Sequence, residues 1–407
     1  MKKLALLLLA LSLATLSTPV SAQSDQRSPP VQQSTQPAQM GAPAAQAKVC
    51  TLTPLTSVEL EPIPGSTRMA APLIVNGVQM NVLVATAGGA SSLTLAAAHS
   101  LGLSAHDTGN FRFIDASSYA SHNYFRLRSV QLGRLPGKDI SFVSTPDPNF
   151  GRNPHLDGVL AADLMGLYDV EIDFAGRRMT YFSSNQCPGQ QGAIVSELER
   201  GGPPPAYGGI VPIKLVSHAE DEKRGYNPGH DSAEGTMVIQ SLFPAYIPAN
   251  TDMIGGDIRT TVVLDGKPLT ANIDTGQEVS SLNTDAARAV YGVTAESPGS
   301  TPVSSSTNTG PDAGVSETVV VHGTKLFMHS FHSLAFGEVT VKNPLVLVQP
   351  DIAGVRDRDN NLQLNSLIRR QDDFPRPDVT IGMDVLRRLH LFFAFAERKL
   401  YVTSAAS

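Results

Sequence analysis

The residue best placed to do chemistry in this sequence is an aspartate at the end of a short apolar run. Residues 271–282 read ANIDTGQEVSSL, so Asp274 follows a strand-like stretch and precedes Thr275 and Gly276. The threonine hydroxyl can fix a tight loop, and glycine allows backbone geometry that a Cβ would forbid. A carboxylate held in such a loop can act as a general base toward a water molecule.

A second stretch of the chain repeats this pattern without its carboxylate. Residues 76–93 align with residues 265–282 without a gap, at a constant offset of 189 (274 minus 85). The threonine recurs as Thr86, and the SSL run recurs at residues 91–93. Ala85, however, falls at the position of the aspartate.

A second pair of segments supports an internal repeat. Residues 157–177 align with residues 378–398 without a gap, at an offset of 221 (378 minus 157). The identical pairs are Asp157 with Asp378, Asp163 with Asp384, Phe174 with Phe395, Ala175 with Ala396, and Arg177 with Arg398. An internal repeat constrains the whole fold, so we expect two lobes of similar construction.

The loop around Asp274 resembles the active-site loop of the aspartic peptidases, particularly the retropepsin-like branch. The TIG run at residues 380–382 resembles the apolar-apolar-Gly strand that crosses beneath that loop in this family. The resemblance covers roughly residues 50–187 and 208–405, and it implies a mostly β, bilobal aspartic-peptidase fold made of two retropepsin-like lobes. In the family the two loop threonines, here Thr86 and Thr275, tie the loops together by hydrogen bonds.

The family's chemistry needs two carboxylates. They lie about 3 Å apart and share one proton, because both cannot ionise at that distance. One activates water while the other polarises the scissile carbonyl. Ala85 has no proton to give or take, and alanines also stand at 87 and 161, where the family has glycine. We therefore expect Asp274 to be the only retained carboxylate of the dyad, ionised at neutral pH, with weak or absent hydrolysis.

Three functions remain open from the sequence. The first is a pseudopeptidase that binds a peptide or protein in the cleft between its lobes. The second is an active aspartic endopeptidase that uses Asp274, for example by pairing it with its copy in a dimer. The third is a structural envelope protein, in which Asp274 would be a structural carboxylate in a strand-end turn.

Other polar residues are candidates for binding, metal or structural roles. Glu278 is close enough to the loop to face a bound peptide main chain, or it is a solvated charge. His322, His329 and His332 lack an evident fourth ligand, so we expect no metal site. Asp163 and Asp384 recur in both repeats and are assigned a structural role. The sequence contains no P-loop or nucleophile elbow, and we expect no cofactor.

The N-terminus indicates export. Residues 1–22 combine two lysines, a short apolar core and a small-residue cleavage site ending at Ala22, as in a secretory signal peptide. The core is too short for a membrane span, and no cysteine follows the cleavage site directly. We expect a periplasmic or secreted protein. Its formal charge changes from −6 to −8 once both lysines are removed, which argues against nucleic acid as a partner.

Composition divides the rest of the chain. Residues 23–49, rich in Gln, Ser, Pro and Ala, are expected to be a disordered tether. Residues 50–187 form the first lobe, 188–207 a Gly/Pro-rich linker, and 208–405 the second lobe. Cys50 and Cys187 flank the first lobe, and export favours a disulfide between them over two free buried thiols. Oligomeric state is left open.

Within the lobes the pattern is one of short strands and turns. Residues 73–75 and 82–84 are apolar and partly β-branched, and the Asn-Gly pair between them predicts a hairpin. A short helix is expected at 95–101, and strands at 130–133 and 140–143. The two offsets differ by 32 residues (221 minus 189), with candidate insertions at 297–314, roughly where a flap folds over the cleft in the family, and at 351–377. Residues 217–235 are expected to be an exposed insertion.

Overall fold

The computed structural model describes residues 52–87, 90–107, 113–114, 120–148, 154–184, 209–217, 256–306, 316–321, 323–350 and 377–405. The expected signal peptide, tether, linker and 217–235 insertion lie essentially outside the described residues, and so do Cys50 and Cys187. Those expectations stay predictions. No helix among the described residues is long and apolar enough to cross a membrane.

The described residues of lobe 1, our name for residues 52–184, form short strands and two short helices. The strands are β1 (Pro54–Glu59), β2 (Glu61–Pro62), β3 (Met69–Val75), β4 (Val78–Val84), β5 (Ser92–Thr94), β6 (Ala105–Asp107), β7 (Phe113–Ile114), β8 (Ala120–Ser121), β9 (Asn123–Leu132), β10 (Leu135–Thr145), β11 (Gly158–Leu160), β12 (Asp169–Asp173) and β13 (Arg178–Phe182). The helices are α1 (Leu95–Ser100) and α2 (Ala162–Met165). The helix predicted at 95–101 is thus confirmed, and the Thr94 hydroxyl caps it by accepting from the Ala97 N–H at 3.0 Å.

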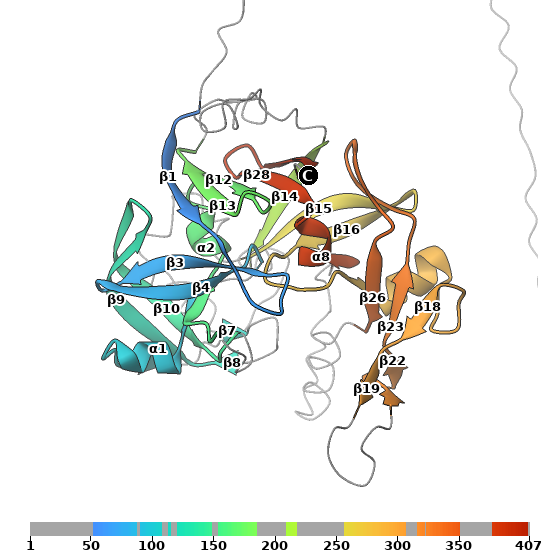
Figure 1. Ribbon diagram of the computed structural model, residues 1–407, viewed down its shortest axis with the longest axis horizontal. Coiled ribbons are helices and arrows are strands. Elements are labelled where there is room, and N and C mark those ends of the chain that lie inside the picture. Colours follow the sequence, from blue (N-terminus) through green and yellow to red (C-terminus); the bar gives the residue numbers. More distant parts are fainter. Residues whose placement is uncertain are drawn as a thin grey trace, which may run out of the picture. The chain divides into compact units, whose positions relative to one another are not determined.

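Lobe 2, our name for residues 209–405, follows the same plan with additional strands (Figure 1). Its strands are β14 (Gly209–Ser217), β15 (Gly256–Leu264), β16 (Lys267–Ile273), β17 (Ser281–Asn283), β18 (Ser300–Pro302), β19 (Ser304–Ser306), β20 (Ser316–Thr318), β21 (Val320–Val321), β22 (Thr324–Lys325), β23 (Phe327–Ser330), β24 (Ser333–Phe336), β25 (Val339–Lys342), β26 (Leu345–Gln349), β27 (Val379–Ile381), β28 (Leu389–Ala394) and β29 (Lys399–Ser404). Its helical turns are α6 (Thr284–Ala286), the π-helical η3 (Ala287–Tyr291) and α8 (Met383–Leu386).

The two lobes share one order of strand pairing. In lobe 1 the β3–β4 hairpin is followed by parallel pairing of β4 with β11, antiparallel pairing of β11 with β5, and parallel pairing of β5 with β10. In lobe 2 the β15–β16 hairpin is followed by the same three pairings, β16 with β27, β27 with β17, and β17 with β26. The aligned segments therefore occupy matching places in the two lobes.

Hydrogen bonds outside the ladders match in the same way. The Asn81 N–H donates to Asp157 Oδ2 at 2.7 Å, and the Thr270 N–H donates to Asp378 Oδ2 at 2.8 Å. The backbone N–H groups of the two aspartates return bonds to Asn81 O at 2.9 Å and to Thr270 O at 2.8 Å. Both aspartates belong to the aligned segments, so the same residues perform the same structural task in each lobe.

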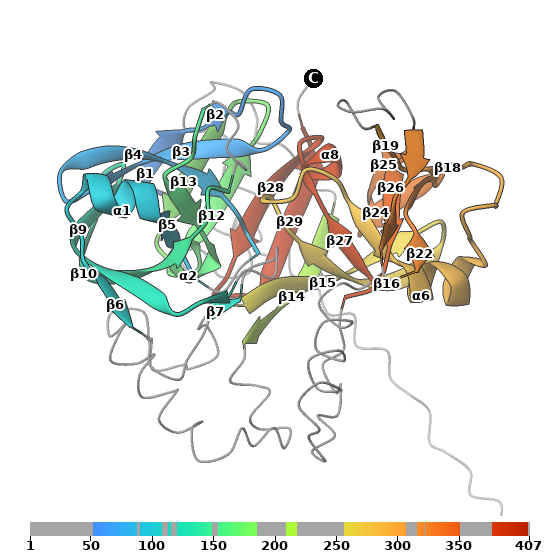
Figure 2. The same ribbon diagram turned by 90° about the horizontal axis from the view of Figure 1, so that it is seen from below.

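A sheet joins the lobes. Its strand order runs β1, β13, β12, β28, β29 and β14, so that β12 of lobe 1 lies beside β28 of lobe 2. The two strands are antiparallel, with Val170 opposite Phe393 and Asp173 opposite His390. The β28–β29 hairpin that follows can be traced in Figure 2. Near this junction His390 Nε2 lies 2.6 Å from Glu171 Oε1, and both side chains are buried.

The hairpin turns at the start of each lobe need left-handed backbone. Asn76 and Gly77 have φ values of 51° and 86°, as the Asn-Gly hairpin signal predicts. Asp265 and Gly266 in the matching turn have φ values of 44° and 77°. Asn76 Oδ1 accepts the Ser129 N–H at 3.0 Å, and Asp265 Oδ1 accepts the N–H groups of His332 and Ser333 at 2.8 Å. An amide and a carboxylate thus do the same work in the two lobes.

Because Asn76 and Asp265 occupy matching turns, the contribution of the Asp265 charge to stability can be tested by substitution. Partial burial opposes ionisation, but hydrogen bonds from His332 and Ser333 outweigh it and hold the pKa of Asp265 below its usual 3.8. A lowered carboxyl pKa adds stability above pH 3.8, and that stability is lost as the pH falls through the folded-state pKa. Asn76 occupies the matching turn with the same left-handed backbone, so we expect Asp265→Asn to fold. Below pH 3.8 this variant should lose less stability than the natural protein. Denaturant midpoints of both proteins measured down to acid pH test this, and parallel pH profiles would contradict it.

Candidate active site

Asp274 and Ala85 stand at matching strand ends. Asp274 follows β16, and its N–H donates to Ile381 O of β27 at 3.0 Å. Ala85 follows β4, and its N–H donates to Leu160 O of β11 at 3.0 Å. Each residue therefore leaves its hairpin at the point where the crossing strand passes beneath the loop.

The two threonines that follow are bonded to each other's loops. The Thr86 N–H donates to Thr275 Oγ1 at 3.0 Å, and the Thr275 N–H donates to Thr86 Oγ1 at 3.1 Å. Each hydroxyl then donates across the lobes, Thr86 to Ile273 O at 2.7 Å and Thr275 to Val84 O at 2.8 Å. Both side chains are almost completely buried, so these four bonds hold the loops in one fixed arrangement.

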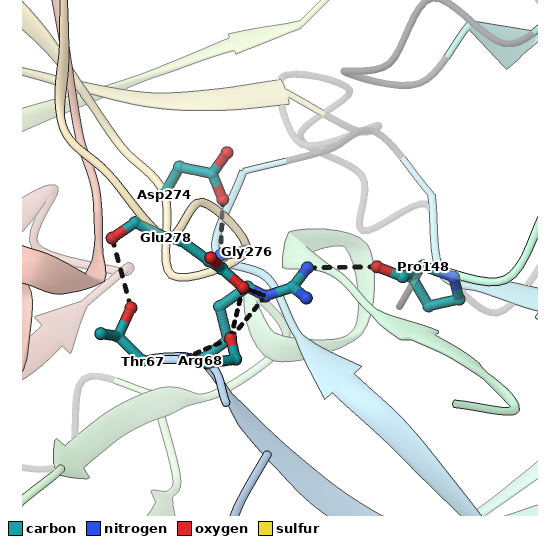
Figure 3. Close-up of polar contacts among 7 residues, drawn as sticks. Thr67, Arg68, Pro148, Asp274, Gly276 and Glu278 are labelled. Atoms are coloured by element: carbon teal, nitrogen blue, oxygen red, sulfur yellow. Dashed lines mark hydrogen bonds and ion pairs between the residues drawn. The ribbon is translucent and has the colours of Figure 1, made fainter. Parts of the chain in front are cut away.

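The Asp274 carboxylate lies inside this arrangement, with the residue only 5% exposed. Its Oδ1 accepts the Gly276 N–H at 2.8 Å (Figure 3). A Cβ placed on Gly276 would lie 2.9 Å from the Ala85 Cβ and 3.0 Å from Asp274 Oδ1. The Ala85 methyl group and the Asp274 carboxylate therefore both lie close to the Cα of Gly276, and no side chain at position 276 would fit between them.

A partly buried aspartate supports each loop from below. Ser280 donates to Asp384 Oδ1 through its hydroxyl at 2.6 Å and its N–H at 2.9 Å. In lobe 1 the Ser91 hydroxyl and N–H donate to Asp163 at 2.6 and 2.8 Å. Burial raises the pKa of both carboxyl groups, partly offset by these hydrogen bonds. The bonds tie each loop to the short helix after the crossing strand, which is the structural role that the sequence predicted for Asp163 and Asp384.

Glu278 lies against lobe 1, which the sequence did not predict. Its Oε1 accepts the Ser66 hydroxyl at 2.7 Å and pairs with Arg68 Nε at 3.3 Å (Figure 3). The Thr67 hydroxyl donates to Glu278 O at 3.2 Å. The Arg68 side chain is 6% exposed, and its Nη1 donates to Pro148 O at 3.1 Å. These contacts make Glu278 a link between the lobes, whereas the sequence suggested a substrate contact or a solvated charge.

No signal in the sequence indicated the partners of Glu278. Residues 66–68 lie in a turn before β3, outside the aligned segments, and Arg68 is about 210 residues from Glu278 in the chain. The sequence marks Arg68 only as a charged residue directly before the apolar stretch at residues 69–75.

The histidines have partners other than metal ions. His329 Nδ1 lies 2.9 Å from Ser300 Oγ, and His332 Nδ1 lies 3.1 Å from Asp265 Oδ2. His322 is outside the described residues. No group of three or more ligand-type side chains suited to a metal ion occurs among the residues that the structure describes.

Comparisons with known proteins give structural likeness only. No family model and no curated protein matches the chain. Among solved structures, basic 7S globulin from soybean (TM-score 0.43, 10% identity) and conglutin gamma from lupine seeds (TM-score 0.43, 9% identity) each match 88% of this chain and 96% of their own. A retropepsin-like aspartic protease from Rickettsia conorii (TM-score 0.22, 18% identity) matches 31% of this chain and 88% of its own.

The fold therefore rests on the strand pairing and on the loop contacts. Two lobes with one pairing order, crossing strands beneath paired loops, and reciprocal threonine bonds define the arrangement. The protein has a mostly β, bilobal aspartic-peptidase fold.

Proposed function

We propose that this protein binds extended peptide segments in a cleft between its two lobes and hydrolyses them weakly or not at all. The observation that carries the proposal is the pairing of Ala85 with Asp274 inside retained loop contacts. The loop scaffold of a peptidase is present, and one carboxylate of the dyad is replaced by a methyl group.

The proposal includes an evolutionary origin of the two lobes by duplication. We take them as copies of one retropepsin-like unit, and Ala85 as the replacement of the catalytic aspartate in the first copy. The matching pairing order and the paired bonds of Asp157 and Asp378 support this. The alanines at 87 and 161 lie in the same loop system, so the first copy has diverged at several positions.

The chemistry follows from the lost carboxylate. Asp274 can hold a water molecule as a general base, but the matching position in the other loop is Ala85, which has no carboxyl group to donate a proton to the carbonyl oxygen. General acid–base assistance is worth roughly 10²- to 10⁴-fold in rate, so the loss of one partner removes much of the catalysis. Binding by addition of an extended strand needs only main-chain hydrogen bonds and is unaffected by that loss.

The alternative in which a second chain supplies the missing aspartate has a structural obstacle. Lobe 1 would have to leave its place beside Asp274, which breaks the threonine bonds, the Arg68–Glu278 pair and the β12–β28 strand pairing. These contacts favour a cleft formed within one chain. A purely structural envelope protein, the third function, would not need a buried carboxylate at Asp274 that is held by the Gly276 N–H.

The same proposal places the mature protein in the periplasm or outside the cell, with a signal peptide removed after Ala22 and a disulfide between Cys50 and Cys187. The signal-like sequence at residues 1–22 and the positions of the cysteines support these points. The expected partner is a peptide or protein, and neither a metal nor a cofactor is required.

A mixed peptide library tests the function directly. The mature protein, incubated with the library at acidic and neutral pH, is expected to retain some peptides and to cleave them at most slowly. Asp274→Asn should keep the binding and abolish any residual cleavage, because the amide cannot act as a base. Strong cleavage by the natural protein that disappears in Asp274→Asn would establish a working peptidase. If no peptide of the library is bound or cleaved, the proposal of a peptide-binding cleft is wrong.

A further inference from the structure

His329 occupies the base of a long hairpin excursion in lobe 2. β18 pairs antiparallel with β23, and Ser300 lies opposite His329 in the first pair of the register. Beyond this base the chain runs through β19, β20, β21 and β22 before it returns to β23. We call the described residues between the two base strands, 303–306, 316–321 and 323–326, the arm; its strands β19 and β22 lie beyond β18 and β23 in Figure 1.

Within its described residues the arm has little buried surface. Val320 is 54% exposed, and Leu326, the residue next to β23, is the buried apolar side chain nearest the base. Backbone bonds connect the base to the arm, from the Val303 N–H to Leu326 O at 2.9 Å and from the Val319 N–H to Val303 O at 2.8 Å. Because few apolar contacts fix the arm itself, its position depends on the β18–β23 pairing.

His329 contributes a side-chain bond to that pairing. Its Nδ1 lies 2.9 Å from Ser300 Oγ, and the same hydroxyl lies 2.8 Å from Thr294 O. Since the carbonyl can only accept, the hydroxyl hydrogen goes to Thr294 and the imidazole donates from Nδ1. Nε2 is then the acceptor nitrogen, and it makes no hydrogen bond to the residues that the structure describes.

A proton added to Nε2 would place a charge where it is poorly accommodated. The residue is 9% exposed, the Phe331 ring centroid lies 4.8 Å from the imidazole centroid, and β26 presents Val346 opposite His329. Asp265 is an acid whose charge acts on His329, and it is already engaged with His332. On the side of the 294–300 loop, Glu296 is paired with Lys325 at 3.1 Å. No described acid contacts the ring to balance the charge.

We propose that His329 is an acid-sensitive latch at the base of the arm, neutral while β18 is paired with β23 and protonated when these two strands separate. Burial lowers the pKa of His329 below its usual 6.5, and Asp265 opposes this only in part. A lowered histidine pKa adds stability above pH 6.5 that is lost as the pH falls through the folded-state pKa. Acidification therefore loosens the base of the arm, independently of what the cleft binds.

Hydrogen–deuterium exchange of the mature protein at about pH 7.5 and about pH 5 tests the latch. After correction for the chemical exchange rate, peptides covering 300–306 and 316–330 should open more readily at the lower pH. The expected increase is roughly tenfold for each unit by which the closed and open pKa values differ. Peptides from lobe 1 report on global unfolding and should not change in parallel.

Two substitutions separate His329 from other acid effects. His329→Gln keeps an amide that can donate to Ser300 but cannot titrate, so arm opening should lose its pH dependence. His332→Gln removes a histidine from the same segment that is 94% exposed, and should behave as the natural protein does. A natural protein whose arm opens equally at both pH values overturns the proposal, even if His329→Gln does not fold. Retention of the full pH response in a folded His329→Gln overturns it as well.

Discussion

Replacement of Ala85 by aspartate alone is expected to leave the protein almost inactive, whereas Ala85→Asp combined with Ala87→Gly and Ala161→Gly is expected to gain cleavage that pepstatin inhibits. The gain is about 10²- to 10⁴-fold, the usual worth of a general acid–base partner. The difference between the single and the triple variant comes from the space around position 85.

Gly276 indicates how little space such a loop leaves. A Cβ there would lie 3.0 Å from Asp274 Oδ1 and 2.9 Å from the Ala85 Cβ. Position 87 aligns with 276, so by analogy we expect the methyl group of Ala87 to lie only about 3.0 Å from the place that a carboxylate at 85 would give its inner oxygen. Ala87 also cannot adopt all the backbone conformations that glycine allows. The aspartate therefore needs glycine at 87 to reach its position opposite Asp274.

Ala161 acts on the same loop from below. Its counterpart Gly382 could not carry a Cβ, which would lie 2.8 Å from the Val279 carbonyl carbon and 3.0 Å from the Ser280 N. By analogy we expect the Cβ of Ala161 to press against the equivalent part of the first loop, and this loop to stand slightly further from its crossing strand; the Ala161 N–H lies 3.0 Å from Ser91 Oγ, against 2.9 Å between the Gly382 N–H and Ser280 Oγ. Glycine at 161 removes that displacement, which matters because dyad chemistry depends on a separation of about 3 Å.

Peptide cleavage by the natural protein, the Ala85→Asp variant and the triple variant measures the effect. The triple variant that also carries Asp274→Asn is the matched control and should lose the gained activity. Equal activity of the single and triple variants would refute the argument from space. A folded triple variant without cleavage would refute the view that the missing carboxylate is what limits hydrolysis.

The sequence predicted those features that are local or repeated. The Asn-Gly turn after β3, the α1 helix and the matching roles of Asp163 and Asp384 all follow from patterns within a few residues or from a constant offset. The placement of Ala85 beside Asp274 was expected from the same offset, and the threonine bonds agree with it.

The contacts between the lobes outside the repeat could not be predicted. The Arg68–Glu278 pair depends on how a turn before β3 meets the second loop, and no periodicity or spacing encodes that meeting. The same holds for the Glu171–His390 contact at the β12–β28 junction, which only the register of two distant strands brings about. In the sequence His329 is only one of three histidines without a fourth metal ligand, whereas its place opposite Ser300 in the first β18–β23 pair depends on the register of the folded strands.

Removal of either loop threonine hydroxyl is expected to destabilise the protein by roughly 2–6 kcal/mol, since it leaves two buried groups without a partner and each costs about 1–3 kcal/mol. Thr86→Val leaves the Thr275 N–H without its acceptor and Ile273 O without its donor. Thr275→Val does the same to the Thr86 N–H and to Val84 O. Valine preserves the shape of threonine, so packing changes little.

The double variant shows whether the four bonds act as one unit. Once one threonine is lost the loops separate, and the second loss then costs less; the combined effect should fall short of the sum by about 0.5–3 kcal/mol. Denaturant midpoints of the single and double variants measure this. Thr270→Val on β16, where the side chain is exposed and its hydroxyl makes no bond to the described residues, is the control and should change stability by at most about 0.5 kcal/mol. Fully additive losses would mean that the two loops are held independently, and that the fixed geometry around Asp274 has another origin.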